Sequence, residues 1–436
     1  MNEEPARLLH LTAAEQARRV RAGEITAAEL LRLQREAIAR DNRAINAYVH
    51  VIDSGPPQAG SSSLAGTTFA VKDNIDMQGL PSHGGLRALH AEPAARSAPV
   101  VQRLQVAGLT GLGKLNQHAM ALGATGHNAD FGDCRNPLRR THVPGGSSSG
   151  SAAAVAAGLC GIALGTDTMG SVRVPAAYCG VVGFKPSFDA LPTEGVMPLA
   201  SLLDHVGVLA RSVEDARLAF GILGPAARGA SAGPPNDIAA FELGIPADLP
   251  ALGADADVAA AFDAALRSLR DRGWRLRPVE IPMQRLGLVR RAGLLLSEAE
   301  LAVTLAPVLA ARRAEVPADL LAMIDYGAGR SAVDLARAIG RMTDLAQWVM
   351  RTLDAVDALL LPTTPQTAFA LDAPVPANQA DYTVLANLAG APAISLPLPA
   401  PPEALPAGLQ VVARRGDDHA LLQLAGLLEA HLAVRD

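Results

Sequence analysis

The sequence predicts an α/β protein built on a largely buried mixed sheet. Short apolar segments alternate with helix-forming ones through the middle of the chain, as in GLTGLG, SAAAVAAG, CGIALGTD and VVGFKPS. This alternation is typical of strands covered by helices. Aromatic residues make up only 3% of the chain, against 40 glycines and 31 prolines, so we expect a core of small aliphatic side chains in which helices pack closely on the sheet.

The domain organisation follows from length and from where strands recur. A chain of 436 residues would by length alone divide into about three domains. No internal repeat is visible, however, and strand-like segments (ALLLP, AISLP and GLQVVARR) return after a helix-rich stretch. We therefore expect a single domain over residues 1–436, with a mainly helical excursion at about 214–353. Strands and a closing helix beginning near Asp417 and Asp418 should occupy about 354–436.

The N-terminal region carries helix-start signals and then a strand. Two capping boxes, Thr12 with Glu15 and Thr26 with Glu29, are each followed by helix formers. The turn-rich segment SGPPQAGSSSLAG then leads into TFAVKDNID, whose alternating apolar residues predict a short strand. Lys72 lies on that strand.

Composition excludes several classes of protein. The chain has 38 Lys and Arg against 43 Asp and Glu, a net charge of -5, so there is no basic footprint for nucleic acid. Cys134, Cys160 and Cys179 form no CxxC pair and leave one over, which disfavours disulfides and zinc and favours a reducing cytoplasm. The acidic start resembles no secretory signal, and the uncharged residues 141–166 include too much loop to span a bilayer. We expect a cytoplasmic protein that binds neither nucleic acid nor membrane.

A phosphate-binding loop is the first candidate site to consider. Residues 108–115, GLTGLGKL, fit the pattern, but Leu115 stands where a Ser or Thr should hold magnesium. A strand entering a turn, with Lys114 at its solvated edge, is the better interpretation.

A nucleophile elbow is the second candidate. Residues 146–150, GSSSG, fit GxSxG with Ser148 at the centre, but an elbow follows an apolar strand and the lead-in RRTHVPG is a loop. Asp204, His205 and His419 could complete a triad, yet nothing in the pattern motivates them.

The ten histidines are the third candidate. None stands in HxxxH or HExxH spacing, and His118 and His127 are nine residues apart in a loop-like region. Surface or structural histidines are expected, without a metal site.

A spaced set of segments points to acyl transfer instead. Ser147 to Ser149 lie at the start of the helix SAAAVAAG, where unpaired amides and the positive end of the helix dipole favour an oxygen that develops negative charge. The turn-like segment at residues 168–171 follows an apolar strand, so further amides can point at the same spot. Backbone amides arranged in this way make an oxyanion hole.

A base for a serine nucleophile can be proposed from the same set. With no plausible histidine, a lysine whose charged form is disfavoured by burial is the remaining candidate. Lys72 follows the apolar residues Phe69, Ala70 and Val71, and desolvation would favour its neutral amine. Taken alone, Lys72 could equally be an edge-strand lysine in solvent, and Ser147 a helix N-cap.

The ordered series FAVKDNID, GKLNQHAMALGATG, PGGSSSGSAAAVAAG and GTDTMGSVRVPAAYCGVVGFKPS resembles the amidase signature family of serine hydrolases. Further matches are LDHVGVLARSVEDA, LLLPTTP, NLAGAPAISLP and GLQVVARRGDD, so the likeness runs over nearly the whole chain. It is densest at about residues 67–216. The resemblance implies a central mixed sheet covered by helices on both faces.

The resemblance also implies a Ser, cis-Ser, Lys triad. It places the nucleophile on Ser171, the bridging serine on Ser147 and the base on Lys72. Ser147 precedes Ser171 by 24 positions, a separation that resembles the family's and selects Ser147 over Ser148 or Ser149. The peptide bond from Gly146 to Ser147 is expected to be cis, a costly geometry kept where a site requires it.

The remaining site residues follow from the same resemblance. Asp167 and Arg173 flank the hole at a spacing that permits an ion pair bracing the loop, while Gly146 supports the bridging serine. The resemblance implies no metal or cofactor. The amides expected to hold the oxyanion are those of Thr168, Met169, Gly170 and Ser171.

Met169 departs from the family pattern, which has glycine there. Because methionine cannot follow backbone angles open only to glycine, either its conformation is ordinary and its side chain trims the acyl pocket, or the hole is altered. We prefer the first, and it predicts a small or slender acyl group.

The leading hypothesis is a freestanding hydrolase that cleaves a small carboxamide to a carboxylate and ammonia or an amine. A subunit of a glutamine-dependent transamidase, or of a two-protein hydrolase of urea-like compounds, is the alternative, so a small partner subunit stays open. A noncatalytic binding protein is disfavoured because all three triad positions are filled. Homodimerisation is a family-based expectation.

Overall fold

The computed structural model describes residues 7–225, 238–249, 253–401 and 403–433. Its centre is an eleven-stranded sheet in the order β1-β3-β2-β4-β6-β5-β10-β11-β9-β7-β8. The strands are β1 (Tyr48–Val51), β2 (Thr68–Lys72), β3 (Thr110–Leu115), β4 (Ile162–Asp167), β5 (Val182–Lys185), β6 (His205–Ala210), β7 (Glu242–Pro246), β8 (Arg275–Val279), β9 (Ala358–Pro362), β10 (Ala393–Pro397) and β11 (Gly408–Val412).

The sheet is mixed, as the sequence predicts. Strand β2 runs parallel to both β3 and β4, and β7 runs parallel to β8 and β9. Between these two parallel parts, β4, β6, β5, β10, β11 and β9 pair antiparallel. The predicted fold class, a single α/β domain with a large mixed sheet flanked by helices, is confirmed.

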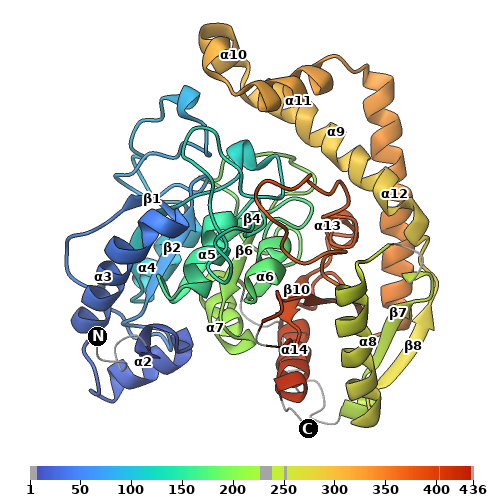
Figure 1. The fold of residues 1–436 in the computed structure, drawn as a ribbon, viewed down its shortest axis with the longest axis horizontal. Coiled ribbons are helices and arrows are strands. Elements are labelled where there is room, and N and C mark those ends of the chain that lie inside the picture. The colour runs from blue at the N-terminus through green and yellow to red at the C-terminus, as the bar shows by residue number, and fades with distance from the viewer. Residues whose placement is uncertain (1–6, 226–237, 250–252, 402, 434–436) are drawn as a thin grey trace.

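Helices lie on both sides of the sheet (Figure 1). They are α2 (Ala13–Arg21), α3 (Ala27–Ile45), α4 (Pro99–Val106), α5 (Ser149–Ala156), α6 (Arg173–Cys179), α7 (Val213–Leu223), α8 (Ala256–Asp271), α9 (Leu286–Thr304), α10 (Ala306–Arg312), α11 (Ala318–Ala328), α12 (Ala332–Ala355), α13 (Val384–Leu388) and α14 (Asp418–Ala433). Short 3-10 turns occur at Arg87–Leu89, Ala119–Ala121, Ile238–Ala240, Met283–Arg285 and Arg313–Glu315.

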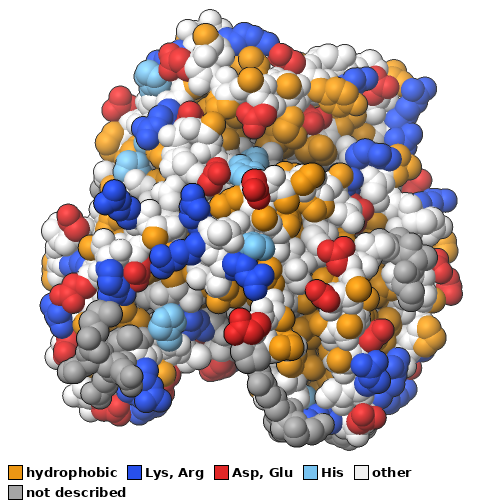
Figure 2. Space-filling model, in the orientation of Figure 1, with side chains coloured by type: hydrophobic (Ala, Val, Ile, Leu, Met, Phe, Trp, Pro, Cys, Tyr) orange, Lys and Arg blue, Asp and Glu red, His pale blue; other side chains and the backbone are white. Residues whose placement is uncertain are grey.

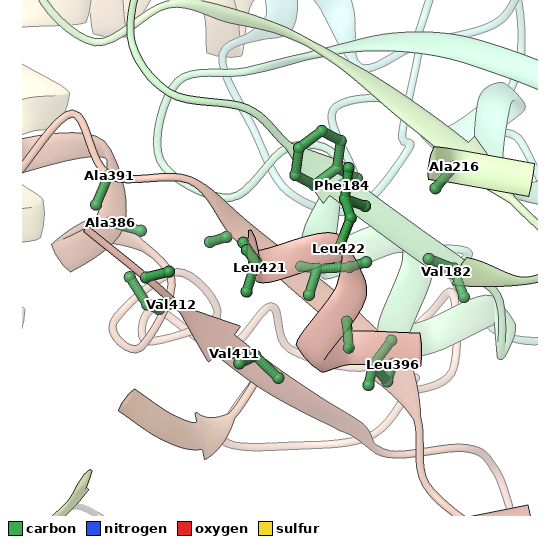
Figure 3. Packing of buried hydrophobic residues seen from close by; sticks show 14 of the residues in the cluster. Val182, Phe184, Ala216, Ala386, Ala391, Leu396, Val411, Val412, Leu421 and Leu422 are labelled. Atoms are coloured by element: carbon green, nitrogen blue, oxygen red, sulfur yellow. The ribbon is translucent and has the colours of Figure 1, made fainter. Parts of the chain in front are cut away.

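Alternation along the strands divides the buried side chains between two faces. On β2, Phe69 and Val71 belong to the large core that includes α4, α7 and α14, while Ala70 belongs to a second core with α3 and α5. Because side chains alternate across a strand, Lys72 lies on the same face as Ala70, toward α5. Figure 3 shows the first core, where Leu421 and Leu422 of α14 pack near Phe184, Leu396 and Val411.

Small residues allow very close packing on the α5 face. A Cβ at Gly150 would lie 2.3 Å from the carbonyl oxygen of Ala47 and 2.6 Å from the amide nitrogen of Asn116. A Cβ at Gly165 of β4 would lie 2.7 Å from Ser148 Oγ. The glycine content noted in the sequence therefore has a structural use at the start of α5.

Both predicted helix starts are confirmed at the cap. Thr12 and Thr26 each accept a hydrogen bond of 3.1 Å, from the amides of Glu15 and Glu29. The Glu15 carboxylate binds Arg18 and Arg19. A reciprocal capping box is instead present at the start of α12, at Ser331.

Two strands lie in the stretch predicted to be mainly helical. Strands β7 and β8 extend the sheet beyond β9, whereas α8 to α12 supply the expected helices. The strand pattern is hidden in the sequence because both segments are short and contain proline, and β8 is largely exposed at the sheet edge.

The expectation for Lys114 is wrong in one respect. Its segment is a strand, but Lys114 is fully buried rather than at a solvated edge, because β3 lies inside the sheet between β1 and β2. Its Nζ donates to the carbonyls of Asp73 and Pro81 at 3.2 and 3.1 Å and to Ser82 Oγ at 2.7 Å.

The surface mixes charges of both signs, as Figure 2 shows for one face. No single helix within the described residues is long and apolar enough to cross a membrane. One pair, Met283–Thr304 with Ala306–Glu315, passes on length and composition together but is bent by 61°.

Candidate active site

Lys72 lies at the end of β2 with its side chain fully buried. Its Nζ is 2.6 Å from Ser147 Oγ and 2.7 Å from Thr166 Oγ1. Burial lowers the pKa of Lys72 to about 7, against weaker opposing effects of Asp204 and Asp167. The amine can therefore be neutral near physiological pH.

The three serines of the GSSSG segment have different partners. The peptide bond from Gly146 to Ser147 is cis, and Ser147 is the one whose hydroxyl meets Lys72. Ser148 Oγ donates to the carbonyl of Thr166 at 3.1 Å, and Ser149 Oγ donates to the carbonyl of Asn116 at 3.3 Å. The predicted cis bond is confirmed, and the neighbouring serines hold the backbone.

Ser171 lies just before α6 and is partly exposed. Its carbonyl accepts from the Ser148 amide at 3.1 Å, which fixes the two segments side by side. Among the hydrogen bonds of the described residues, none joins the hydroxyls of Ser147 and Ser171. The structure thus brings Lys72 and Ser147 into contact and places the Ser171 backbone against Ser148.

The predicted oxyanion amides are not equivalent. The Gly170 amide already donates to Asp167 Oδ1 at 2.7 Å. In the described part of the chain, the amides of Thr168, Met169 and Ser171 donate to no protein acceptor. Gly170 has φ +136, and a Cβ there would lie 2.2 Å from Thr383 Oγ1, so glycine is required for shape.

Met169 has no positive φ, so its backbone conformation is ordinary. Its carbonyl accepts from Thr383 Oγ1 at 2.6 Å. Its side chain is partly buried against α9, where a Cβ at Gly293 would lie 2.7 Å from Met169 Sδ. The first of the two sequence interpretations, an ordinary backbone with a side chain that fills space, matches this geometry.

Asp167 and Arg173 form the ion pair that their spacing permits. The guanidinium Nη2 lies 2.9 Å from Asp167 Oδ1, and both side chains are fully buried. Burial by itself would raise the pKa of Asp167, but the guanidinium and further hydrogen bonds hold it well below its usual range. Arg173 also donates to Asn387 Oδ1 at 2.6 Å and Gln410 Oε1 at 2.5 Å. The pair therefore ties the nucleophile segment to α13 and β11.

Sequence reasoning missed Thr166 and Asn74. Thr166 Oγ1 meets Lys72 Nζ and also accepts from Asn74 Nδ2 at 3.2 Å. The signal is visible only in the sheet register, because β2 pairs with β4 and so brings Thr166 beside the end of β2. Asn387 and Gln410 were missed for a similar reason, although Gln410 is conspicuous as a polar residue inside the apolar strand GLQVV.

A pocket with a volume of about 220 Å³ adjoins this polar cluster. Asn74, Thr166 and Thr168 form its inner wall. Asp204 and His205 line another part, and apolar side chains including Met197 and Leu199 complete it.

The other sequence candidates have structural partners. His205 Nδ1 lies 2.6 Å from the carbonyl of Leu203, and His419 Nε2 lies 3.3 Å from the carbonyl of Pro225. His118 Nδ1 lies 3.2 Å from Thr125 Oγ1, and His127 pairs with Asp133. No group of three or more His, Cys, Asp or Glu side chains in the described ranges could hold a metal ion.

Comparison with known proteins gives consistent matches over the chain. A family model described as Amidase matches residues 36–422. The glutamyl-tRNA(Gln) amidotransferase protein of Acidobacterium capsulatum, one subunit of that enzyme, is 32% identical over 468 aligned residues, covering 95% of this chain and 97% of that protein. A crystal structure of an amidase superposes with a TM-score of 0.86 at 30% identity, covering 97% of this chain and 100% of the other. A vestigial protein complex described as revealing the origins of an s-triazine catabolic enzyme gives a TM-score of 0.87 at 26% identity, covering 97% and 99%.

Proposed function

Because the chain belongs to the amidase signature family, we propose that it hydrolyses a small carboxamide through an acyl-enzyme on Ser171. Cleavage of an amide C–N bond follows from the family. The observation that carries the assignment of roles is the 2.6 Å contact between Lys72 Nζ and Ser147 Oγ in a fully buried setting. A neutral amine beside a hydroxyl is what a lysine base needs.

In the proposed first step, neutral Lys72 takes a proton from Ser147, and Ser147 takes one from Ser171. Ser171 Oγ then attacks the amide carbonyl, and Ser147 returns a proton to the leaving nitrogen. Water attacks the resulting ester by the same relay. The Ser147 to Ser171 hydrogen bond is expected to form when substrate is bound, since catalytic hydrogen bonds often tighten only in the complex.

The oxyanion is proposed to be held by the amides of Thr168, Met169 and Ser171, which have no acceptor among the described residues. The Gly170 amide is engaged by Asp167, so its contribution is to shape the turn. Asp167 and Arg173 brace this turn rather than touch substrate. Such preorganised amides stabilise charge where it develops in the transition state.

The acyl group is proposed to be small or slender. Met169 lies close to the nucleophile in sequence, and its side chain fills the space up to Gly293 of α9. A bulky acyl group would have to displace it.

The test is Ser171→Ala, with Ser149→Ala as the matched control at the neighbouring serine loop. We expect Ser171→Ala to lower ammonia release from a cleaved carboxamide by about 10⁴-fold or more, whereas Ser149→Ala keeps most activity. Covalent labelling by an acylating inhibitor should be lost only in the first variant. Undiminished release by Ser171→Ala refutes the assignment.

A second candidate, one component of a larger amidotransferase, is favoured by one observation. The relative from Acidobacterium capsulatum is named as a subunit of such an enzyme and matches along nearly its whole length. The purified chain should be assayed alone for ammonia release and its native mass measured. Activity of the isolated chain supports the freestanding hydrolase, and activity that appears only with a copurified partner supports the multi-protein enzyme.

A further inference from the structure

The pocket beside the active site is lined by hydrogen-bond acceptors that lack donors. Its inner wall contains Thr166, the partner of Lys72, and Thr168, the first residue of the nucleophile segment. Two of its lining side chains, Asn74 and His205, are 3% and 4% exposed and each has a buried polar atom without a partner.

The unpartnered atom of His205 is an acceptor. Its Nδ1 lies 2.6 Å from the carbonyl of Leu203 and 3.2 Å from that of Asp167, so Nδ1 carries the hydrogen. Burial, with the nearby charge of Lys185, lowers the pKa of His205 well below its ordinary value, so the ring is neutral. Nε2 therefore has a free lone pair, and it is buried without a donor.

Asn74 and Asp204 add further acceptors. Asn74 Nδ2 donates to Thr166, which leaves Oδ1 as a buried acceptor with no donor. Asp204 receives the Thr168 hydroxyl at 2.6 Å and the amides of Leu199 and Ala200, and its carboxylate retains further lone pairs. No lysine or arginine among the described residues lines this pocket.

Buried acceptors without donors destabilise a protein, so a ligand that brings several N–H groups would be favoured here. We propose that this pocket binds the nitrogen released from the substrate, as ammonia or a primary amine. Naming that nitrogen as the released one rests on the proposed amide hydrolysis. The binding itself follows from the acceptors and from the carboxylate of Asp204.

An amine held in this pocket lies beside the nucleophile segment and can run the acylation step backwards. Its nitrogen lone pair attacks the carbonyl carbon of the Ser171 ester, a C–N bond forms and the C–O bond to Ser171 breaks. The proton from the amine passes to Ser171 Oγ. The products are an amide and free enzyme, in competition with hydrolysis by water.

Binding can be tested without catalysis, in the Ser171→Ala protein. Methylammonium chloride should raise the melting temperature saturably, by about 1 to 2 °C, at constant ionic strength. Tetramethylammonium chloride, which has the same charge and no N–H group, should not. Equal effects of the two salts, or no effect of either, overturn the proposed site and leave the role of Ser171 untouched.

The released-nitrogen assignment is tested in the active enzyme by the ratio of N-methylamide to carboxylate formed with added methylamine. This ratio should saturate with methylamine in the native protein and fall about fivefold at low methylamine in His205→Asn, which keeps a donor near the Nδ1 position and removes Nε2. His50→Asn is the matched control, because His50 Nε2 is also buried without a partner but lies on β1 at the sheet edge. Inhibition competitive with substrate and without N-methylamide would place the site on the acyl side and overturn the assignment.

Discussion

Lys72 and Lys114 lie on the paired parallel strands β2 and β3, and both side chains are fully buried. Their ammonium groups nevertheless meet different partners. Lys72 Nζ contacts two hydroxyls, those of Ser147 and Thr166. Lys114 Nζ contacts two carbonyls and Ser82 Oγ, and lies 3.6 Å from the carboxylate of Asp73.

The difference shows that partner chemistry, more than burial, separates a base from a structural cation. Burial lowers the pKa of both lysines, and for Lys114 the charge of Asp73 opposes this shift. Carbonyl and carboxylate oxygens only accept, so Lys114 must keep its protons to satisfy them. A hydroxyl can donate as well as accept, so Lys72 can exist as a neutral amine that takes a proton from Ser147.

The strongest way to break this comparison is Lys72→Met. We expect kcat/KM to fall by about 10⁴-fold, because the base is removed, while stability is kept, because an apolar side chain replaces a buried amine. Amide hydrolysis and chemical denaturation should be measured on the same protein. Retained activity would show that another group deprotonates Ser147.

Lys114→Met should act in the opposite way. It leaves the buried Asp73 carboxylate without its cation, so we expect the free energy of unfolding to fall by about 3–5 kcal/mol. Below the melting temperature, kcat/KM should change much less than in Lys72→Met. The loss should be smaller at low pH, where Asp73 can take up a proton, and a loss that is independent of pH would contradict the pairing.

The pH profile sharpens the comparison. Because the neutral form of Lys72 is the base and its pKa is lowered to about 7, kcat/KM should rise about tenfold per pH unit below pH 7 and level off above it. Activity is thus lost as the pH falls through the pKa of Lys72. A profile that first rises near pH 10 would mean that Lys72 is charged in the free enzyme.

The smallest expected effect is at Met169. Met169→Gly opens space toward Gly293 of α9, so the preferred acyl chain should lengthen and the ratio of kcat/KM for longer over shorter acyl amides should rise about tenfold. Met169→Leu, which nearly conserves volume, is the control. An unchanged chain-length preference in Met169→Gly would rule out Met169 as the pocket wall.

Much of the fold could be predicted from local pattern. Each strand segment singled out in the sequence is a strand, and the closing helix begins at Asp418 as expected. Strands β7 and β8 were missed because edge strands need little apolar alternation.

The site was predicted in part. Ordered motifs indicated Lys72, Ser147 and the pairing of Asp167 with Arg173, because each is spaced regularly from a glycine-rich turn. The engagement of the Gly170 amide by Asp167, and the contacts of Thr166 and Asn387, could not be predicted from spacing.

The sequence by itself determined the α/β class, the order of strands and loops, and the residue types that can carry acyl transfer, since these depend on periodicity and turn chemistry within a few residues. Only the tertiary structure decided what each buried side chain meets. Lys72 and Lys114 lie in similar apolar strand segments, and the same sequence reasoning left either in solvent. Ser147 and Thr166 are 75 and 94 residues from Lys72, and Asp73 is 41 from Lys114. Packing of these distant segments makes one lysine a base and the other a structural cation.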